Sequence, residues 1–175
     1  MKLGKSIVNL TLACILLLGF AAQSAVAADK GVTENQKNLE AWAKKPEVIS
    51  AIEKANTGKA AFNNSKWKAL GNNDPKVKSY MTSEAGKLLT SLQKGSLGKL
   101  FIRDAKGNFV AGSKKPAIFN ITDRPAFSNA MRGKSWASKK AKADPTTQQN
   151  SIQISSPVVS KGKVIGVIHA SVIVK

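Results

Sequence analysis

The sequence predicts an α+β domain in which several helices precede a five-stranded antiparallel sheet. Three observations support this fold class. Apolar residues recur three and four positions apart through about residue 92, which is the spacing of helices that pack by one face. After Gly98 they occur in short runs separated by glycine-containing turns, as in antiparallel strands. The last run, residues 164–174, is β-branched almost throughout, which favours a strand.

Residues 1–27 have the layout of a secretory signal peptide. Lys2 and Lys5 precede an apolar run over residues 7–20, and small residues lead up to a cleavage point after Ala27. The apolar run is shorter than the ~20 residues of a spanning helix, although an uncleaved anchor is the alternative. Removing 27 of the 175 residues leaves 148, which suits one domain. We therefore expect a periplasmic or secreted protein with no membrane span after cleavage.

The mature chain has no cysteine, because Cys14 lies within the signal segment. Disulfides and thiol chemistry are therefore excluded from the expected functions. Lipidation is not expected either, since Thr11 stands where a lipoprotein signal usually has leucine, and apolar residues continue after Cys14.

The mature chain is strongly basic. The whole sequence has 28 Lys and Arg against 10 Asp and Glu, and loss of Lys2 and Lys5 leaves a net charge of +16. Such a charge attracts anions and repels cations. The lysines are scattered, and zinc-finger spacing, a helix-turn-helix signature and aromatic-rich ribonucleoprotein motifs are all missing from the sequence. The composition therefore favours anionic partners but does not favour nucleic acid.

Residues 28–96 form the expected helical region. Thr33 is placed to cap a first helix, and Pro46 is placed in the first turn of a second. The pair Asp74-Pro75 combines a capping residue with a first-turn proline, and the apolar stripe that follows predicts one helix through Leu92.

Residues 97–175 form the expected sheet. A hairpin is predicted around the turn over residues 104–108, and Asp123 is placed to cap a short helix that ends near Met131. Three further strands are expected to complete the sheet, over residues 136–142, 151–159 and 164–174.

Four stretches of this half, in order, resemble the Cache family of extracellular, PAS-like sensor domains. They are Leu100–Asn108, Thr122–Lys134, Ile152–Val158 and Gly162–Val167. The resemblance implies a PAS-like sheet that encloses a pocket for a small molecule such as an amino acid or a short carboxylate. Family members usually belong to chemoreceptors, sensor kinases or cyclic-dinucleotide enzymes. This sequence has no following membrane helix or output domain, so the resemblance implies a partner: a membrane receptor, sensor kinase or transporter.

The resemblance also points to an arginine as the ligand contact. Arg124 lies in the stretch that resembles the family's Asp-Arg-Pro element, and a guanidinium can hold a carboxylate by two parallel hydrogen bonds. The alternative is a structural role in which Arg124 pairs with Asp123 or braces the loop. Ala126 departs from the family, which often has an aromatic residue there, and leaves Phe127 as the aromatic side chain of this element.

Four more residues complete the predicted ligand-binding set with Arg124. His169 and Ser171 alternate on the last strand and face one side of the sheet. Ser171 falls where the family often has a polar pocket residue, so the resemblance implies that both side chains supply polar contacts. Phe127 and Trp136 would form apolar walls, although Trp136 is equally suited to the core. His169 is the only histidine, and a satisfied buried histidine is the competing interpretation.

The sequence contains no recognisable catalytic set, so we do not expect an enzyme. It has no second histidine, no haem-attachment motif, no phosphate-binding glycine loop and no nucleophile elbow. No cofactor or metal is expected. The leading hypothesis is a periplasmic binding protein for a small organic anion. The alternatives are an exported basic protein that binds a polyanion or an acidic partner, and haem or metal capture through His169.

Overall fold

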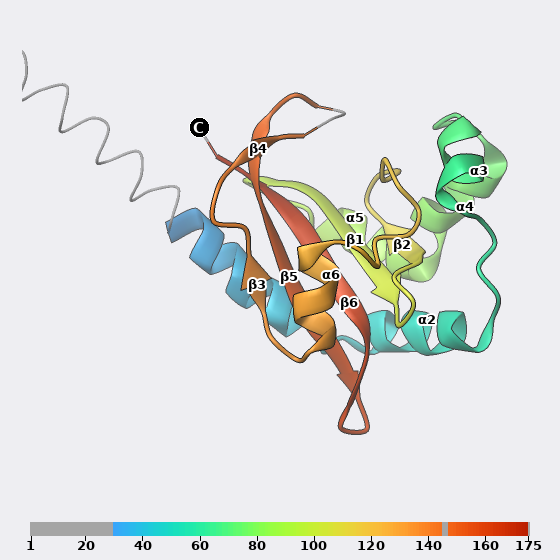
Figure 1. Cartoon of the computed structure of the whole chain (residues 1–175), viewed down its shortest axis with the longest axis horizontal. Coiled ribbons are helices and arrows are strands. Elements are labelled where there is room, and N and C mark those ends of the chain that lie inside the picture. The colour runs from blue at the N-terminus through green and yellow to red at the C-terminus, as the bar shows by residue number, and fades with distance from the viewer. Residues whose placement is uncertain (1–29, 145–146, 175) are drawn as a thin grey trace, which may run out of the picture.

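The computed structural model describes residues 30–144 and 147–174 and has the predicted α+β fold, drawn in Figure 1. The predicted signal segment and Cys14 lie outside the described residues. A helix over residues 30–42 comes first. It is followed by α2 (Pro46–Thr57), α3 (Asn64–Ala69), α4 (Pro75–Thr82) and α5 (Glu84–Leu92). The rest of the chain forms β1 (Leu97–Asp104), β2 (Phe109–Gly112), α6 (Pro125–Met131), β3 (Trp136–Ala137), β4 (Lys142–Ala143), β5 (Asn150–Ser160) and β6 (Lys163–Ile173).

The sheet is antiparallel, with the strand order β2-β1-β6-β5-β3 and with β4 also paired to β5. The prediction of a single strand over residues 136–142 was wrong, because this segment forms two short strands that pair with different parts of β5. Between them, the backbone N–H of Gln153 donates to Ser138 Oγ at 3.1 Å. A side chain replaces a strand carbonyl at this point, so the ladder is interrupted.

One face of the sheet packs against the 30–42 helix, α2 and α5. Ile102, Ile154 and Ile168 come from the three central strands, and they share one apolar core with Ile52 of α2 and Leu89 of α5. All five side chains are fully buried. We call this side of the sheet the helix face.

The opposite face is covered by α6 and by the loop that joins β2 to α6. We call it the α6 face. Figure 1 shows α6 lying over β5 and β6, and Phe127 of α6 packs against Val167 of β6. Next to α6, an aromatic cluster joins α3 and α4 to the sheet. Its rings belong to Phe62, Trp67, Tyr80, Phe101, Phe109 and Phe119.

Two predicted helix caps differ from the structure. Thr33 does not cap a helix, because the helix already includes residue 30. Asp123 does not cap α6, because Arg124 is the N-cap residue and makes no side-chain capping bond.

The single helix predicted from Pro75 to Leu92 is two helices, α4 and α5, that meet at Ser83. The Ser83 hydroxyl caps α5 by accepting from the Gly86 N–H at 3.1 Å. A side chain at Gly86 could not fit, since its Cβ would lie 2.4 Å from the Tyr80 carbonyl oxygen. Glycine at position 86 therefore lets the first turn of α5 pack closely against the backbone of Tyr80 and Met81 in α4.

Candidate functional site

Polar side chains gather on the α6 face, near the N-terminal end of β1. We call Lys99, Ser151, Ser155, His169 and Ser171 the polar patch; each is at most 7% exposed. Strand register places them together, because Lys99 lies opposite Ser171 and Ser155 lies opposite His169. Buried polar groups are costly unless they have partners, so a patch of this kind needs explanation.

A bulge in β1 explains why Lys99 belongs to this face. Leu97 pairs with Val172 on the helix face, whereas Lys99, two residues later, pairs with Ser171 on the α6 face. Regular alternation would have put both residues on one side. The irregularity around Gly98 thus turns a lysine into the interior.

Ser155 carries the least satisfied group of the patch. Its residue is fully buried, and among the described residues its hydroxyl has no hydrogen-bond partner. Its carbonyl oxygen, in contrast, accepts from Gln36 Nε2 at 3.2 Å. A buried hydroxyl without a partner costs about 1–3 kcal/mol. No other described residue uses the hydrogen-bonding capacity of Ser155 Oγ.

Lys99 is held by a carboxylate. Its ammonium donates to both oxygens of Asp144, at 2.6 and 2.8 Å, and the two side chains are 7% and 10% exposed. The Thr147 N–H also donates to Asp144 Oδ1, at 3.0 Å. Asp144 comes from the segment between β4 and β5, so the ion pair joins the edge of the sheet to its centre.

His169 is engaged by a buried arginine. Arg103 Nε donates to His169 Nε2 at 3.0 Å, and the guanidinium lies over the rings of Phe101 and Phe109. Burial, with the nearby Arg103 charge, holds the pKa of His169 well below its usual value. Burial also lowers the pKa of Arg103 to about 9, although the neighbouring Asp104 charge opposes this shift. His169 is therefore a neutral acceptor in the folded protein.

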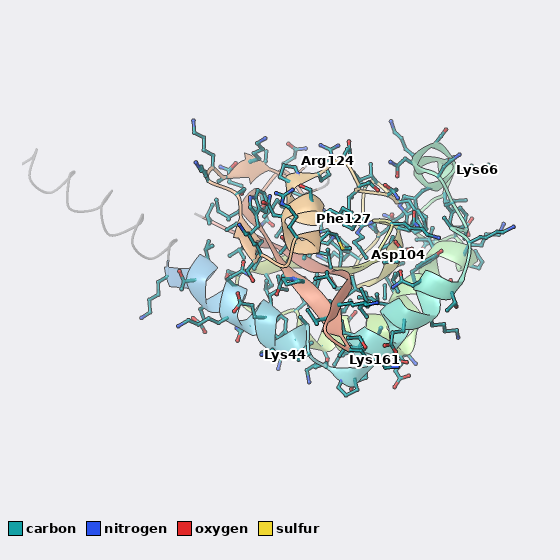
Figure 2. The ribbon with its side chains drawn as sticks, turned by 60° about the horizontal axis from the view of Figure 1, so that its bottom comes forward. Lys44, Lys66, Asp104, Arg124, Phe127 and Lys161 are labelled. Atoms are coloured by element: carbon teal, nitrogen blue, oxygen red, sulfur yellow. The ribbon has the colours of Figure 1, made fainter. Side chains whose placement is uncertain are left out.

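Four of the five predicted site residues lie on the α6 face of the sheet or in α6 itself, and the fifth is exposed. His169 and Ser171 lie in the polar patch, Phe127 of α6 is buried in a cluster with Val167, and Trp136 on β3 lies opposite Ser155, half-buried. Arg124, labelled in Figure 2, is the N-cap residue of α6. Its side chain is 58% exposed. Its Nε is 3.8 Å from Asp123 Oδ1.

Sequence reasoning missed Lys99, Arg103 and Ser155. Alternation along the two central strands would have pointed to them, since Lys99 and Arg103 flank Phe101 on β1 at two-residue spacing. The sequence predicts which face of its strand Ser155 lies on. It does not give the pairing of that strand with the next one, so His169 could not be identified as the neighbour of Ser155.

The edge of the sheet beside the polar patch is basic. Between α6 and β4, residues 132–142 contain no acidic side chain and five cationic ones, all of them exposed: Arg132, Lys134, Lys139, Lys140 and Lys142. We call this segment the basic rim. Its field favours the approach of anions to this side of the molecule.

A surface groove of about 590 Å³ lies elsewhere, between α2, the start of α5 and β2. Glu47, Lys54 and Glu84 are among its lining residues, and Glu47 Oε2 is shielded from solvent without a hydrogen-bond partner among the described residues. The groove contains none of the predicted site residues.

The part of the chain that the structure describes holds no cluster of three His, Cys, Asp or Glu side chains suited to a metal ion. Nor does any helix within residues 30–144 and 147–174 have the length and hydrophobicity to cross a bilayer.

Neither a protein-family model nor a curated protein matches this chain. Solved structures do. The sensor domain of the Vibrio cholerae histidine kinase DctB has a TM-score of 0.55 and 17% identity, over 90% of this chain and 56% of that one.

Two chemoreceptor domains also match. The ligand-binding domain of Pseudomonas aeruginosa PctC, in complex with GABA, has a TM-score of 0.48 and 13% identity, over 93% of this chain and 61% of that one. The domain of Campylobacter jejuni Tlp3, in complex with L-valine, has a TM-score of 0.44 and 16% identity, over 83% and 62%. This chain thus spans less than two thirds of each of these domains. With the sheet order and the α6 cover, the DctB match establishes that the chain has the PAS-like fold of Cache sensor domains.

Proposed function

We propose that this protein is a non-enzymatic sensor module that binds a small organic anion, such as a carboxylate, on the α6 face of its sheet. The observation that carries the proposal is Ser155 Oγ, a fully buried hydroxyl of the polar patch that has no hydrogen-bond partner among residues 30–144 and 147–174. Trp136, His169 and Ser171 lie on neighbouring positions of the same face. A bound polar ligand would satisfy Ser155 and offset the cost of burying the patch.

Charge supports an anion rather than a cation. The mature sequence carries +16, and the basic rim stands beside the patch. Lys99 is a buried cation within it. A cationic ligand would be repelled on approach and would meet Lys99 in the interior.

Arg124 keeps a place in this proposal at the edge of the site. Its exposed side chain, at the N-cap position of α6, would contact a ligand from the solvent side and release Asp123 on doing so. An Arg124→Ala variant would then lose a small part of the affinity. The apolar walls would be Phe127, which is buried, and Trp136.

We further propose that the domain works outside the cytoplasm and relays binding through a membrane receptor, sensor kinase or transporter. The signal-peptide layout of residues 1–27 supports the location. The fold of the histidine kinase sensor domain, to which this chain is similar, supports a role in signalling.

The test is a thermal-shift screen of residues 28–175 against short carboxylates and amino acids. A ligand that binds only the folded state raises the melting temperature as its concentration increases. Positive compounds are then measured by calorimetry on the unchanged protein, on Ser155→Ala and on Ser91→Ala, a matched control for an exposed serine of α5. Loss of affinity in Ser155→Ala alone supports the proposal. Equal affinity in all three proteins contradicts the assigned site.

The basic rim supports one competing function, the binding of a polyanion. Contacts between exposed lysines and a polyanion weaken steeply with salt, whereas a buried site is screened much less. Binding of heparin that collapses between 50 and 200 mM NaCl (about the range over which such contacts are lost), together with a blank small-molecule screen, would favour this function.

A further inference from the structure

The ion pair between Lys99 and Asp144 has the form of a bound carboxylate. The ammonium meets both oxygens of one carboxylate, at 2.6 and 2.8 Å, inside a patch where Ser155, His169 and Ser171 are also buried. The carboxylate belongs to Asp144, which lies in the segment before β5 at the edge of the sheet and not beside Lys99 on a central strand.

The pairing also has a physical reason. An ammonium that is buried on the sheet needs an anion beside it, since a buried unpaired charge is strongly unfavourable. Asp144 meets this need through a side-chain carboxylate, which has the same functional group as acetate or any small organic acid. A ligand carboxylate would therefore satisfy Lys99 equally well in chemical terms.

We propose that Lys99 is the anion-binding residue of the site and that Asp144 is a built-in competitor for it. A ligand binds when its carboxylate replaces that of Asp144 at Lys99 Nζ. The inference rests on the proposed function and assigns the central electrostatic contact to a lysine of β1. It also predicts that the affinity of the unchanged protein for small carboxylates is limited by Asp144.

The experiment uses Asp144→Ala, with sodium acetate as the probe and sodium chloride at equal ionic strength as the reference. Acetate is expected to raise the melting temperature of Asp144→Ala more than that of the unchanged protein. At ten times the dissociation constant the rise would be about 4 °C. Glu40→Ala is the matched control, because Glu40 is an exposed carboxylate on the 30–42 helix and its loss should leave the acetate response unchanged.

Two further variants separate the outcomes. Asp144→Asn keeps the size of the side chain and its acceptor for the Thr147 N–H, so it should fold if Asp144→Ala does not. In the double variant Lys99→Met, Asp144→Leu the cation is gone, and the extra acetate response should disappear. An equal acetate response in Asp144→Ala and in the unchanged protein overturns the proposal, as does an Asp144 variant that acetate fails to stabilise at all.

Failure of this inference is distinguishable from failure of the proposed function. If carboxylates bind the unchanged protein through Ser155 but Asp144 variants gain nothing, only the role of Lys99 is wrong. If neither the unchanged protein nor the Asp144 variants respond to any carboxylate, the anion-binding function itself is wrong.

Discussion

The two faces of the sheet are built from the same strands but from different chemistry. On the helix face, Ile154 and Ile168 are fully buried among apolar side chains of α2 and α5. On the α6 face, the very next residues, Ser155 and His169, are equally buried but polar. A face that only stabilised the fold would gain more from apolar residues. The contrast teaches that the helix face holds the domain together, whereas the α6 face retains costly groups that a ligand can use.

The largest expected effect comes from the helix face. Ile154→Ala should lower the free energy of unfolding by about 3 kcal/mol, because it leaves a cavity in the main core. Chemical denaturation monitored by circular dichroism measures this loss. Affinity for a ligand, measured where the variant is folded, should hardly change. A loss below about 1 kcal/mol would contradict the view that this face supplies the stability.

A pH-dependent effect of intermediate size is expected from His169. Its pKa is lower in the folded than in the unfolded protein, so the unfolded chain binds the extra proton as the pH falls below about 6.5. The free energy of unfolding should therefore decrease on acidification from pH 6.5, by up to about 1.4 kcal/mol per pH unit.

The control for this effect is His169→Gln, which stays neutral and offers an acceptor to Arg103. Denaturation curves at pH 6.5 and 5.0 should show a smaller difference for the variant than for the unchanged protein. Identical slopes would mean that His169 is not held neutral by burial.

The smallest effect on stability, and the clearest one on binding, is expected from Ser155→Ala. Removing a hydroxyl that has no partner should leave the free energy of unfolding within about 1 kcal/mol or raise it. Affinity for a small anion should fall about tenfold, which corresponds to about 1.4 kcal/mol. Denaturation and calorimetry on the same protein measure both. A variant that loses stability instead would indicate that Ser155 belongs to the packed core.

Local features of the fold were predictable from the sequence, and non-local ones were not. The turn around Asp104 was identified because its chemistry is local: Asp104 Oδ1 accepts from the N–H groups of Lys106 and Asn108. The turn before β6 was identified for the same reason, since Lys161 and Gly162 both take positive φ angles. Such signals need only a few neighbouring residues.

The site was predictable only in part. Alternation on the last strand placed His169 and Ser171 on one face, because that pattern needs one strand alone. Alternation with Phe101 and Arg103 gives the face of Lys99, but its contact with Asp144 joins residues 45 positions apart and has no local signal. The exposure of Arg124 depends on how α6 sits on the sheet, which a local motif does not determine.

The central claim is that the α6 face, and not the groove beside α2, receives the ligand. It is tested most directly by a two-dimensional NMR titration of labelled protein with the best compound of the carboxylate screen, or with acetate if none binds more tightly. The account predicts that the amide signals of Lys99, Ser155, His169 and Ser171 shift together with one dissociation constant. Shifts confined to residues 46–55 and 83–85, which line the groove, would contradict it.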